Sequence, residues 1–266
     1  MKTHIESTGV HDIDARGEDK LRIMRYPCYV EPKYDGELAW AITTNGKPRL
    51  VNKYGKGRTD CPITDQLPEN VILMGELYYG DGKREAVYSL LSNKESDDLK
   101  LLVFDVIQHG GTYTGSMTYI QRRQLLEKLI PKATSHVSLV PSVMAVDEAE
   151  VRALFDQHVK DGYEGVMVKA NGTLRGFGCD WVKMKYQTTA DLRVISIDPI
   201  QERMEVEVPF SGSTRPCGVK LPNRYKPNVH IGDIVEIKHY GVLSGGGLRH
   251  PSYVRTREKG KRVSLD

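Results

Sequence analysis

The sequence predicts an α+β domain followed by a small all-β domain, on two observations. Up to about residue 188, apolar runs of strand length alternate with segments of helical periodicity. After residue 189 no helical pattern occurs, and five short strand-like segments are separated by Pro and Gly turns. Five strands in about 75 residues suit a small barrel of the oligonucleotide-binding (OB) type. We therefore expect one domain over residues 1–188 and a second over residues 189–266.

The composition is that of an ordinary soluble protein. Of the 266 residues, 39% are hydrophobic and 27% are charged, so the chain can bury a core and is not expected to be disordered. The formal net charge of +3 is too small to identify a nucleic-acid partner by itself. The four cysteines form no Cys-x-x-Cys pair, which argues against a zinc site or a disulfide framework and favours reduced, buried thiols. Because no signal peptide or membrane-length apolar run is found, we expect a cytoplasmic protein without a membrane partner.

Strands of the first domain are predicted from apolar runs bounded by turn residues. Residues 38–43 and 49–53 are expected to form a hairpin, since an Asn-Gly turn joins them. The run at residues 99–107 is apolar enough for a buried central strand. Further strands are expected over residues 71–79, 164–169 and 180–185.

Helices are predicted from periodicity and end signals. Thr118 and Gln121 make a capping box for a helix that Pro131 stops. Asp147 opens a second helix, which Gly162 closes. Residues 83–93 also have helical spacing of their apolar positions. These helices are expected to flank antiparallel sheets.

A short polar segment around Lys33 is the first candidate site. Strand alternation would project Glu31, Lys33 and Asp35 to one side, with Lys33 between two carboxylates. Gly36 would let the backbone turn or approach a ligand closely. Taken alone, Lys-x-Asp-Gly marks a surface lysine in a hairpin more often than a nucleophile, because so short a pattern also arises by chance.

Other charged residues lie where an apolar core would not accept them unpaired. Glu76 and Glu164 are set within or beside hydrophobic runs, so each needs a partner, and a salt bridge is the ordinary explanation. Lys183 and Lys185 are two residues apart on one strand and are expected to point the same way. Two adjacent ammonium groups repel each other unless an anion such as phosphate lies between them, although both could simply reach solvent.

These separate signals line up in a known order. The chain resembles the covalent nucleotidyltransferase superfamily, and within it most resembles an ATP-dependent DNA ligase, from about Tyr29 to the C-terminus. The resemblance implies an adenylation domain followed by an OB-fold domain. The segments that carry it are, in order, Lys33-Tyr34-Asp35-Gly36, Gly75-Glu76-Leu77, Phe104-Asp105 and residues 164–169, 181–185 and 251–259.

The resemblance implies a chemistry. Lys33 would attack the α-phosphate of ATP, forming a lysine–AMP phosphoramidate and releasing pyrophosphate. Lys183, Lys185 and Mg²⁺, or Mn²⁺ in its place, would lower the pKa of Lys33 and stabilise the charge on the phosphate. AMP would then pass to the 5′-phosphate of a nick in duplex DNA, and the 3′-OH would displace it. Asp35 would act near the 3′-OH in these later steps.

The resemblance also implies binding residues. Glu31 would accept from the adenine amino group, Phe104 would stack on the base, and Glu76 would contact the ribose. Glu164, with Glu76, would hold the metal ion. Arg255 and Arg257 would close over ATP and orient the pyrophosphate. The barrel would bind DNA phosphates through Arg193, Arg203, Arg215, Lys220, Arg224, Lys226, Lys238 and Arg249, and the chain is expected to act as a monomer.

Two positions depart from the family pattern. Leu38 stands where many relatives carry an arginine that contacts ribose. Asn52-Lys53 stands where Ser-Arg is usual, so Lys53 or Arg58 would have to supply the nucleotide contact.

Three alternatives stay open at this point. An RNA ligase is one, because Leu38 breaks the arginine pattern, and an RNA-capping guanylyltransferase is another, because it shares the lysine, the barrel and the terminal motif. A non-catalytic OB-type nucleic-acid binder is the third, and it would predict damage to the lysine site. Lys33, Glu164, Lys183 and Lys185 are all present, which favours an enzyme.

Overall fold

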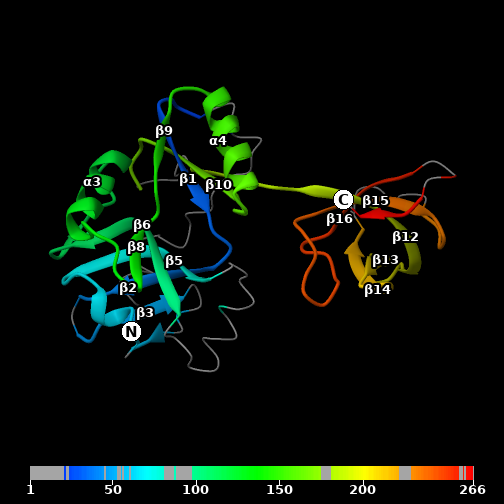
Figure 1. The fold of residues 1–266 in the computed structure, drawn as a ribbon, viewed down its shortest axis with the longest axis horizontal. Helices are drawn as coiled ribbons and strands as arrows, with labels where there is room; N and C mark the ends of the chain where they lie inside the picture. The colour runs from blue at the N-terminus through cyan, green and yellow to red at the C-terminus, as the bar shows by residue number, and fades with distance from the viewer. Residues whose placement is uncertain are drawn as a thin grey trace. The chain divides into compact units, whose positions relative to one another are not determined.

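The computed structural model describes residues 21, 24–44, 46–52, 55, 57–59, 61–80, 87, 98–174, 181–221, 229–257, 260 and 262–265. The chain divides into two compact units, the first ending at Met184 and the second starting at Lys185. In both units most of the described structure is sheet, with few helices (Figure 1). The helix predicted over residues 83–93 lies outside the described residues, apart from Val87.

The larger sheet of the first unit has seven strands, in the order β4-β3-β2-β5-β6-β7, with β8 also paired to β6. All pairings are antiparallel except β6 with β8. The predicted hairpin is confirmed, since β2 and β3 pair, and β6 is the central strand expected, with partners on both edges. The strands are β2 (Glu37–Ile42), β3 (Arg49–Asn52), β4 (Gly57–Arg58), β5 (Val71–Tyr79), β6 (Leu99–His109), β7 (Thr112–Tyr113) and β8 (Val137–Leu139).

The smaller sheet has the order β11-β10-β1-β9. Its strands are β1 (Cys28–Lys33), β9 (Val143–Ala145), β10 (Gly165–Ala170) and β11 (Trp181–Lys185). The antiparallel pairing of β1 with β10 sets Glu31 opposite Met167 and Lys33 opposite Gly165. The sequence did not predict β9, because it is only three residues long and two of them, Val143 and Met144, are exposed.

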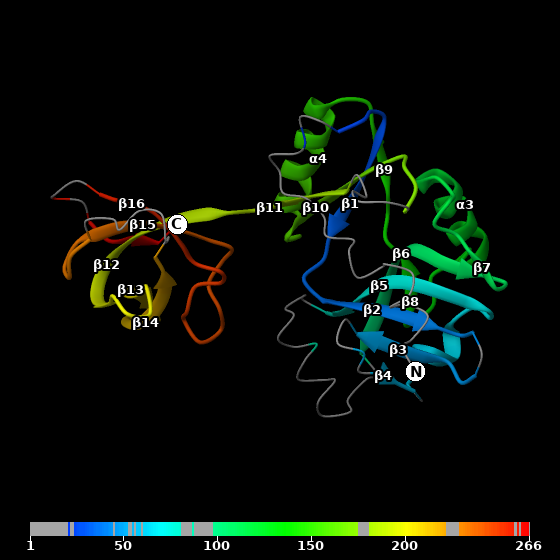
Figure 2. The ribbon, with the colours of Figure 1, turned by 180° about the vertical axis from the view of Figure 1, so that it is seen from behind.

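Helices α3 (Tyr119–Leu129) and α4 (Glu148–Lys160) lie against the sheets of the first unit (Figures 1 and 2). Helix α3 packs on β6, and helix α4 packs on β10 and β1. Both were predicted, and their start signals are confirmed: Gln121 accepts from the Thr118 amide, and Asp147 accepts from the amide of Glu150. The 3₁₀ turn η3 (Thr64–Gln66) precedes β5.

The seven-stranded sheet is apolar on both faces. One face packs with Leu126 of α3 around residues such as Leu73 and Leu101. The other face carries Trp40 and Ile107, and it packs against Trp181 of β11 in the smaller sheet. The two sheets of the first unit therefore face each other across an apolar layer, and the candidate site lies in that layer.

The second unit is a closed ring of five strands. The ring runs β12-β13-β14-β16-β15 and returns to β12, with β14 and β16 parallel and the other pairs antiparallel. Alternate residues point inward, so Leu192, Val206, Val219 and Ile237 form its core. The strands are β12 (Thr188–Asp198), β13 (Arg203–Phe210), β14 (Ser213–Lys220), β15 (Ile234–His239), β16 (Ser252–Thr256) and the unpredicted β17 (Ser264–Leu265), which pairs with β12.

The three thiols among the described residues are buried, as the sequence suggests. Cys28, Cys61 and Cys217 are free cysteines with little exposure, and Cys179 lies outside the described residues. Burial raises the pKa of Cys28 to about 11. Among the described residues, no helix is both long and apolar enough to cross a membrane.

Candidate active site

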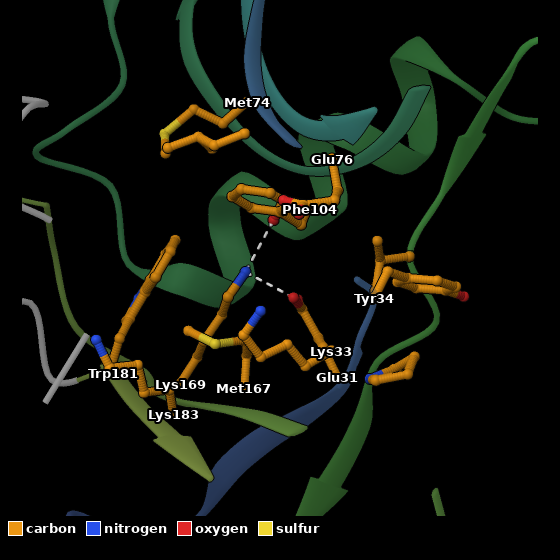
Figure 3. Close-up of a pocket in the computed structure, with 13 residues that line it drawn as sticks. Glu31, Lys33, Tyr34, Met74, Glu76, Phe104, Met167, Lys169, Trp181 and Lys183 are labelled. Carbon is orange, nitrogen blue, oxygen red and sulfur yellow. Dashed lines mark hydrogen bonds and ion pairs between the residues drawn. The ribbon is translucent and has the colours of Figure 1, made fainter. Parts of the chain in front are cut away.

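A pocket lies between the two sheets of the first unit (Figure 3). It brings together five of the residues predicted to take part in the chemistry or in nucleotide binding: Glu31, Lys33, Glu76, Phe104 and Lys183. They come from β1, β5, β6 and β11, so only the packing of one sheet on the other makes them neighbours.

Lys33 is the last residue of β1, and its amine meets a carboxylate. Lys33 Nζ donates to Glu164 Oε2 at 2.5 Å, and the Lys33 carbonyl accepts from the Glu164 amide at 3.1 Å. The Lys33 side chain is 20% exposed and that of Glu164 is 9% exposed. The amine is therefore oriented by a mostly buried carboxylate but remains reachable from solvent.

A buried network surrounds Glu31. Lys169 Nζ lies 2.7 Å from Glu31 Oε2, and both side chains are almost fully buried. Tyr119 donates its hydroxyl hydrogen to Glu31 Oε1 at 2.6 Å. Burial raises the pKa of Glu31, while the charge of Lys169 and the hydrogen bonds from Lys169 and Tyr119 act in the opposite direction.

Sequence reasoning assigned no role to Lys169 or Tyr119. Lys169 does carry a signal, because a lysine within an apolar strand of residues 165–170 needs a buried partner. Tyr119 carries no such signal in the sequence, since an aromatic residue at the start of a helix usually belongs to the hydrophobic core. Its partner Glu31 is 88 residues away in the chain.

One part of the pocket is aromatic and apolar. The rings of Phe104 and Trp181 meet edge to face with centroids 6.1 Å apart. Lys169 Nζ lies 4.1 Å from the Trp181 ring centroid. It also donates to the Phe104 carbonyl at 3.1 Å, a hydrogen bond drawn as a dashed line in Figure 3. Met74 and Met167 complete an apolar region that suits a planar ring.

The position of Phe104 is held by its neighbour. Asp105 forms a bidentate pair with Arg122 of α3, at 2.7 and 3.0 Å, and both side chains are 1% exposed. Arg122 also donates to the Met117 carbonyl at 2.7 Å. The pair thus joins the strand that carries Phe104 to the helix that carries Tyr119.

Gly36 is required because the backbone at this position passes very close to β5. A Cβ at Gly36 would lie 2.1 Å from the Leu77 carbonyl oxygen, so a side chain there would force the two strands apart. The Gly36 amide donates to Glu76 Oε1 at 3.1 Å. The loop after Lys33 is therefore fixed to β5.

The strand geometry that was expected to project Glu31, Lys33 and Asp35 to one side does not extend to Asp35. Because β1 ends at Lys33, strand alternation does not continue, and Asp35 is not among the residues that line the pocket. Lys185 is likewise absent from the lining, although Lys183 is present. Lys185 Nζ lies 5.5 Å from the ring centroid of Tyr240 in the second unit.

Three further predicted residues, Lys53, Arg224 and Lys226, lie outside the described residues, as does the side chain of Arg58. Leu38, at the position of the family's arginine, lines the pocket directly. Within the described part of the chain, the cations that line the pocket are Lys33, Lys169 and Lys183.

Some carboxylates at this site could serve as ligands of a metal ion. No cluster of three or more His, Cys, Asp or Glu side chains occurs among the described residues. Mg²⁺ usually keeps several waters and is held by one or two carboxylates together with substrate phosphates. Glu164 is not among the residues that line the pocket, but its carboxylate oxygen lies at the amine of Lys33, which does line it, and so fits such a partial site. Glu76 lines the pocket directly.

In the second unit, the two arginines of the terminal motif differ. Arg257 is bidentate to Asp191 at 2.7 and 3.1 Å and lies 3.2 Å from Glu236. Arg255 contacts Glu236 at 2.6 Å, and its side chain is 63% exposed. Arg255 is therefore the more accessible of the two.

Six of the eight basic residues predicted for the barrel are among the described residues, on its strands and one loop. Arg193, Arg215 and Lys238 are exposed, and Arg249 is half-buried. Arg203 and Lys220 are also exposed and stand directly opposite each other on β13 and β14. Like charges in that arrangement repel, so an anion such as a phosphate would suit the pair.

Comparison with known proteins identifies similar sequences. A family model described as the ATP dependent DNA ligase domain matches residues 17–185. A probable DNA ligase of Dictyoglomus thermophilum is 25% identical over 182 residues, which are 59% of this chain and 31% of that protein. DNA ligase 1 of Korarchaeum cryptofilum is 32% identical over 192 residues, 64% of this chain and 35% of that protein. The chain spans about a third of the length of these curated relatives.

The fold is also found among solved structures. One structure of a Lig E DNA ligase, described as DNA binding with a minimal scaffold, matches with a TM-score of 0.72 at 18% identity. The match covers 91% of this chain and 97% of that one. At this identity the likeness concerns the fold alone.

Proposed function

We propose a function from one premise: this chain belongs to the ATP-dependent DNA ligase domain family, whose model matches residues 17–185, more than half of its 266 residues. The proposed activity is the sealing of nicks in duplex DNA with ATP, through AMP on Lys33 and then AMP on the DNA 5′-phosphate. The observation that carries it is the partly exposed amine of Lys33 in a pocket that also holds the buried carboxylate of Glu31 and aromatic rings.

In this proposal the first unit is the adenylation domain and the second an OB-fold domain. The ring of five strands that closes between β12 and β13 supports the OB assignment. The domain boundary is proposed near residues 185–189, where the first unit ends and β12 begins.

Lys33 is the proposed nucleophile. Its amine must lose a proton before it attacks the α-phosphate, and Glu164 at 2.5 Å is the group that can accept or share that proton. A nitrogen–phosphorus bond then forms as the bond to pyrophosphate breaks. Lys183, which lines the pocket, would stabilise the negative charge on the phosphate, with Lys185 as the second proposed cation.

The base would occupy the apolar part of the pocket. Phe104 would stack on it, and Glu31 would accept a hydrogen bond from the adenine amino group. Glu76 of β5 is the proposed ribose contact. It accepts a hydrogen bond from the amide of Gly36, in the segment that follows Lys33. Lys53 is a further proposed nucleotide contact.

Glu164 and Glu76 are the proposed ligands of Mg²⁺, or of Mn²⁺ in its place. When bound, such an ion would neutralise charge on the phosphates. Arg255 and Arg257 would orient the leaving pyrophosphate. The greater exposure of Arg255 makes it the more direct candidate of the two.

The later steps return Lys33 to its starting state. The 5′-phosphate of the nick attacks the phosphorus of the bound AMP, the bond to Lys33 breaks, and the amine regains a proton. The 3′-OH then attacks the activated 5′-phosphate and AMP leaves. Asp35, two residues beyond Lys33 and outside the pocket lining, is the proposed contact near the 3′-OH.

The second unit is proposed to contact the DNA backbone, with the chain acting as a monomer. Exposed basic side chains on the barrel support this, since phosphate contacts need accessible cations. The proposed contacts are Arg193, Arg203, Arg215, Lys220, Arg224, Lys226, Lys238 and Arg249.

The test is incubation of the chain with ATP, GTP or NAD⁺, followed by intact-mass analysis and a sealing assay on nicked duplex DNA. We expect an AMP adduct from ATP and sealed DNA, and expect Lys33→Ala and Lys33→Arg to form no adduct. The arginine variant is the matched control, because it keeps the positive charge but not the nucleophilic amine. A GMP adduct would instead indicate capping, and joining of RNA alone an RNA ligase.

A further inference from the structure

Behind Glu31 lies a pair of hydroxyl groups that the proposed chemistry does not use. Tyr119 is 1% exposed, does not line the pocket, and holds Glu31 Oε1 at 2.6 Å. Ser142 Oγ lies 2.8 Å from the Tyr119 hydroxyl oxygen. Ser142 follows β8, and Tyr119 is the first residue of α3, so the packing of two separate segments brings the two hydroxyls together.

The direction of these hydrogen bonds follows from which of the groups carry a hydrogen that they can donate. An ionised carboxylate only accepts, so the single hydrogen of the Tyr119 hydroxyl is donated to Glu31. The Tyr119 oxygen must then accept from Ser142. Ser142 and Tyr119 therefore form a directed relay that ends on one oxygen of Glu31, and Lys169 holds the other oxygen at 2.7 Å.

A carboxylate held in this way has a fixed orientation and a defined role. Tyr119 holds one oxygen from outside the pocket lining, and Lys169, which itself lines the pocket, holds the other. The ionised carboxylate can offer the pocket only lone pairs, so toward a ligand it acts as a hydrogen-bond acceptor. The 6-amino group of adenine is a donor, whereas the 6-oxo group of guanine is an acceptor that would face a like charge. Sites built to pair one polar group discriminate strongly against the analogue that cannot pair.

We propose that Ser142 and Tyr119 are positioning residues that make the pocket select 6-aminopurine over 6-oxopurine nucleotides, by holding Glu31 as a fixed hydrogen-bond acceptor. This inference rests on the proposed function, since it assumes that a purine nucleotide binds beside Glu31. Neither residue contacts the nucleotide.

The charges around Glu31 set the direction of the pH dependence. Lys169 on β10 and Tyr119 on α3 stabilise the ionised carboxylate, whereas Asp105 on β6, itself paired with Arg122, destabilises it. Lys33, on the same strand as Glu31, is paired with Glu164. Loss of the Tyr119 hydroxyl removes one stabilising contact and so moves the pKa of Glu31 further upward. A protonated Glu31 is a donor that guanine can accept from, so discrimination weakens as pH falls.

The experiment compares Tyr119→Phe and Ser142→Ala with a matched control, Tyr29→Phe. The rings of Tyr29 and Tyr119 pack with centroids 4.7 Å apart, so the control removes a neighbouring phenol hydroxyl by the same chemical change. The probes are the α,β-methylene analogues of ATP and GTP, which bind without reacting. Calorimetry measures the dissociation constant of each analogue at about pH 8 and about pH 6.

We expect Tyr119→Phe to lower the preference for the ATP analogue about tenfold, the usual effect of losing one hydrogen bond to a charged group, and more at the lower pH. Ser142→Ala should lower it less, and Tyr29→Phe should leave it unchanged. An unchanged preference in both relay variants, with wild-type thermal unfolding, overturns the inference. If Tyr119→Phe does not fold, Ser142→Ala alone decides.

Measurements on the wild-type protein distinguish a failure of this inference from a failure of the proposed function. Wild-type protein that forms the AMP adduct on Lys33, together with an unchanged preference in the variants, overturns only the roles of Ser142 and Tyr119. Wild-type protein that binds neither analogue and forms no adduct overturns the proposed function, and this inference with it.

Discussion

The Lys33 amine lies 2.5 Å from Glu164 Oε2, although 131 residues separate the two in the chain. The antiparallel pairing of β1 with β10 creates this contact, because it sets Lys33 opposite Gly165, the residue after Glu164. Both side chains are mostly shielded from water, which strengthens their attraction. The carboxylate is therefore part of the environment in which the amine has to react.

Glu164→Gln tests what this carboxylate does. The change keeps the shape and removes the charge, so the amine would lose its proposed proton acceptor and the proposed metal site would lose a ligand. We expect AMP attachment to slow about 100-fold or more and to require more Mg²⁺. The measurement is the rate of adduct formation across a Mg²⁺ titration. Glu127→Gln, at an exposed position of α3, is the control, and equal rates for both variants would show that Glu164 has neither role.

Arg122→Leu tests the buried pair behind Phe104. It leaves Asp105 charged, 1% exposed and without the guanidinium that holds both its oxygens. We expect the free energy of unfolding to fall by about 3–5 kcal/mol in urea titrations. Arg152→Leu removes an exposed arginine paired with Glu148 on α4 and should cost about 0.5 kcal/mol or less. A small loss from Arg122→Leu would mean that water or another group compensates Asp105.

Because His239 is buried, we expect the second unit to lose stability as the pH falls. Its side chain is 1% exposed, its Nδ1 lies 3.1 Å from the Gly241 amide nitrogen, and its Nε2 has no hydrogen bond among the described residues. Burial lowers its pKa below 6.5. The unfolded chain then binds more protons than the folded one below about pH 6.5, so stability is lost as pH falls through that range.

The measurement for His239 is urea unfolding at about pH 7.5 and about pH 5.5. His239→Asn should show a smaller loss than the wild type, since the Asn side-chain oxygen can accept from the Gly241 amide but does not titrate. His250→Asn is the control, because His250 is exposed and its φ of 48° suits asparagine. Equal pH dependence in wild type and His239→Asn would contradict the prediction.

The facing cations Arg203 and Lys220 predict a salt-dependent contact with DNA. If both meet phosphates, changing both to Gln should lower the slope of log affinity against log salt by roughly 0.9 for each contact. Fluorescence anisotropy with a nicked duplex at several salt concentrations measures the slope. Lys128→Gln on α3 serves as the control, and a slope unchanged from wild type in the double variant would exclude this surface from binding.

Much of the local structure was predictable because it depends on neighbours in the chain. Period-2 and period-3.6 apolar patterns, with capping residues and turn residues between them, indicated β5, β6, α3 and α4 nearly to their ends. The short strands β7, β8 and β9 were missed, since two or three residues cannot establish a period.

The amino-acid sequence identifies the chemistry-bearing residues and their order: the lysine segment, the carboxylates in apolar runs, and the paired lysines. Which of them lie close together depends on the folded arrangement of the strands. It placed Lys183 in the pocket lining but not Asp35 or Lys185. It also enclosed Glu31 between Lys169 and Tyr119. The physical reason is that strand register and the packing of one sheet on another act between residues far apart in the chain, so no local pattern records them.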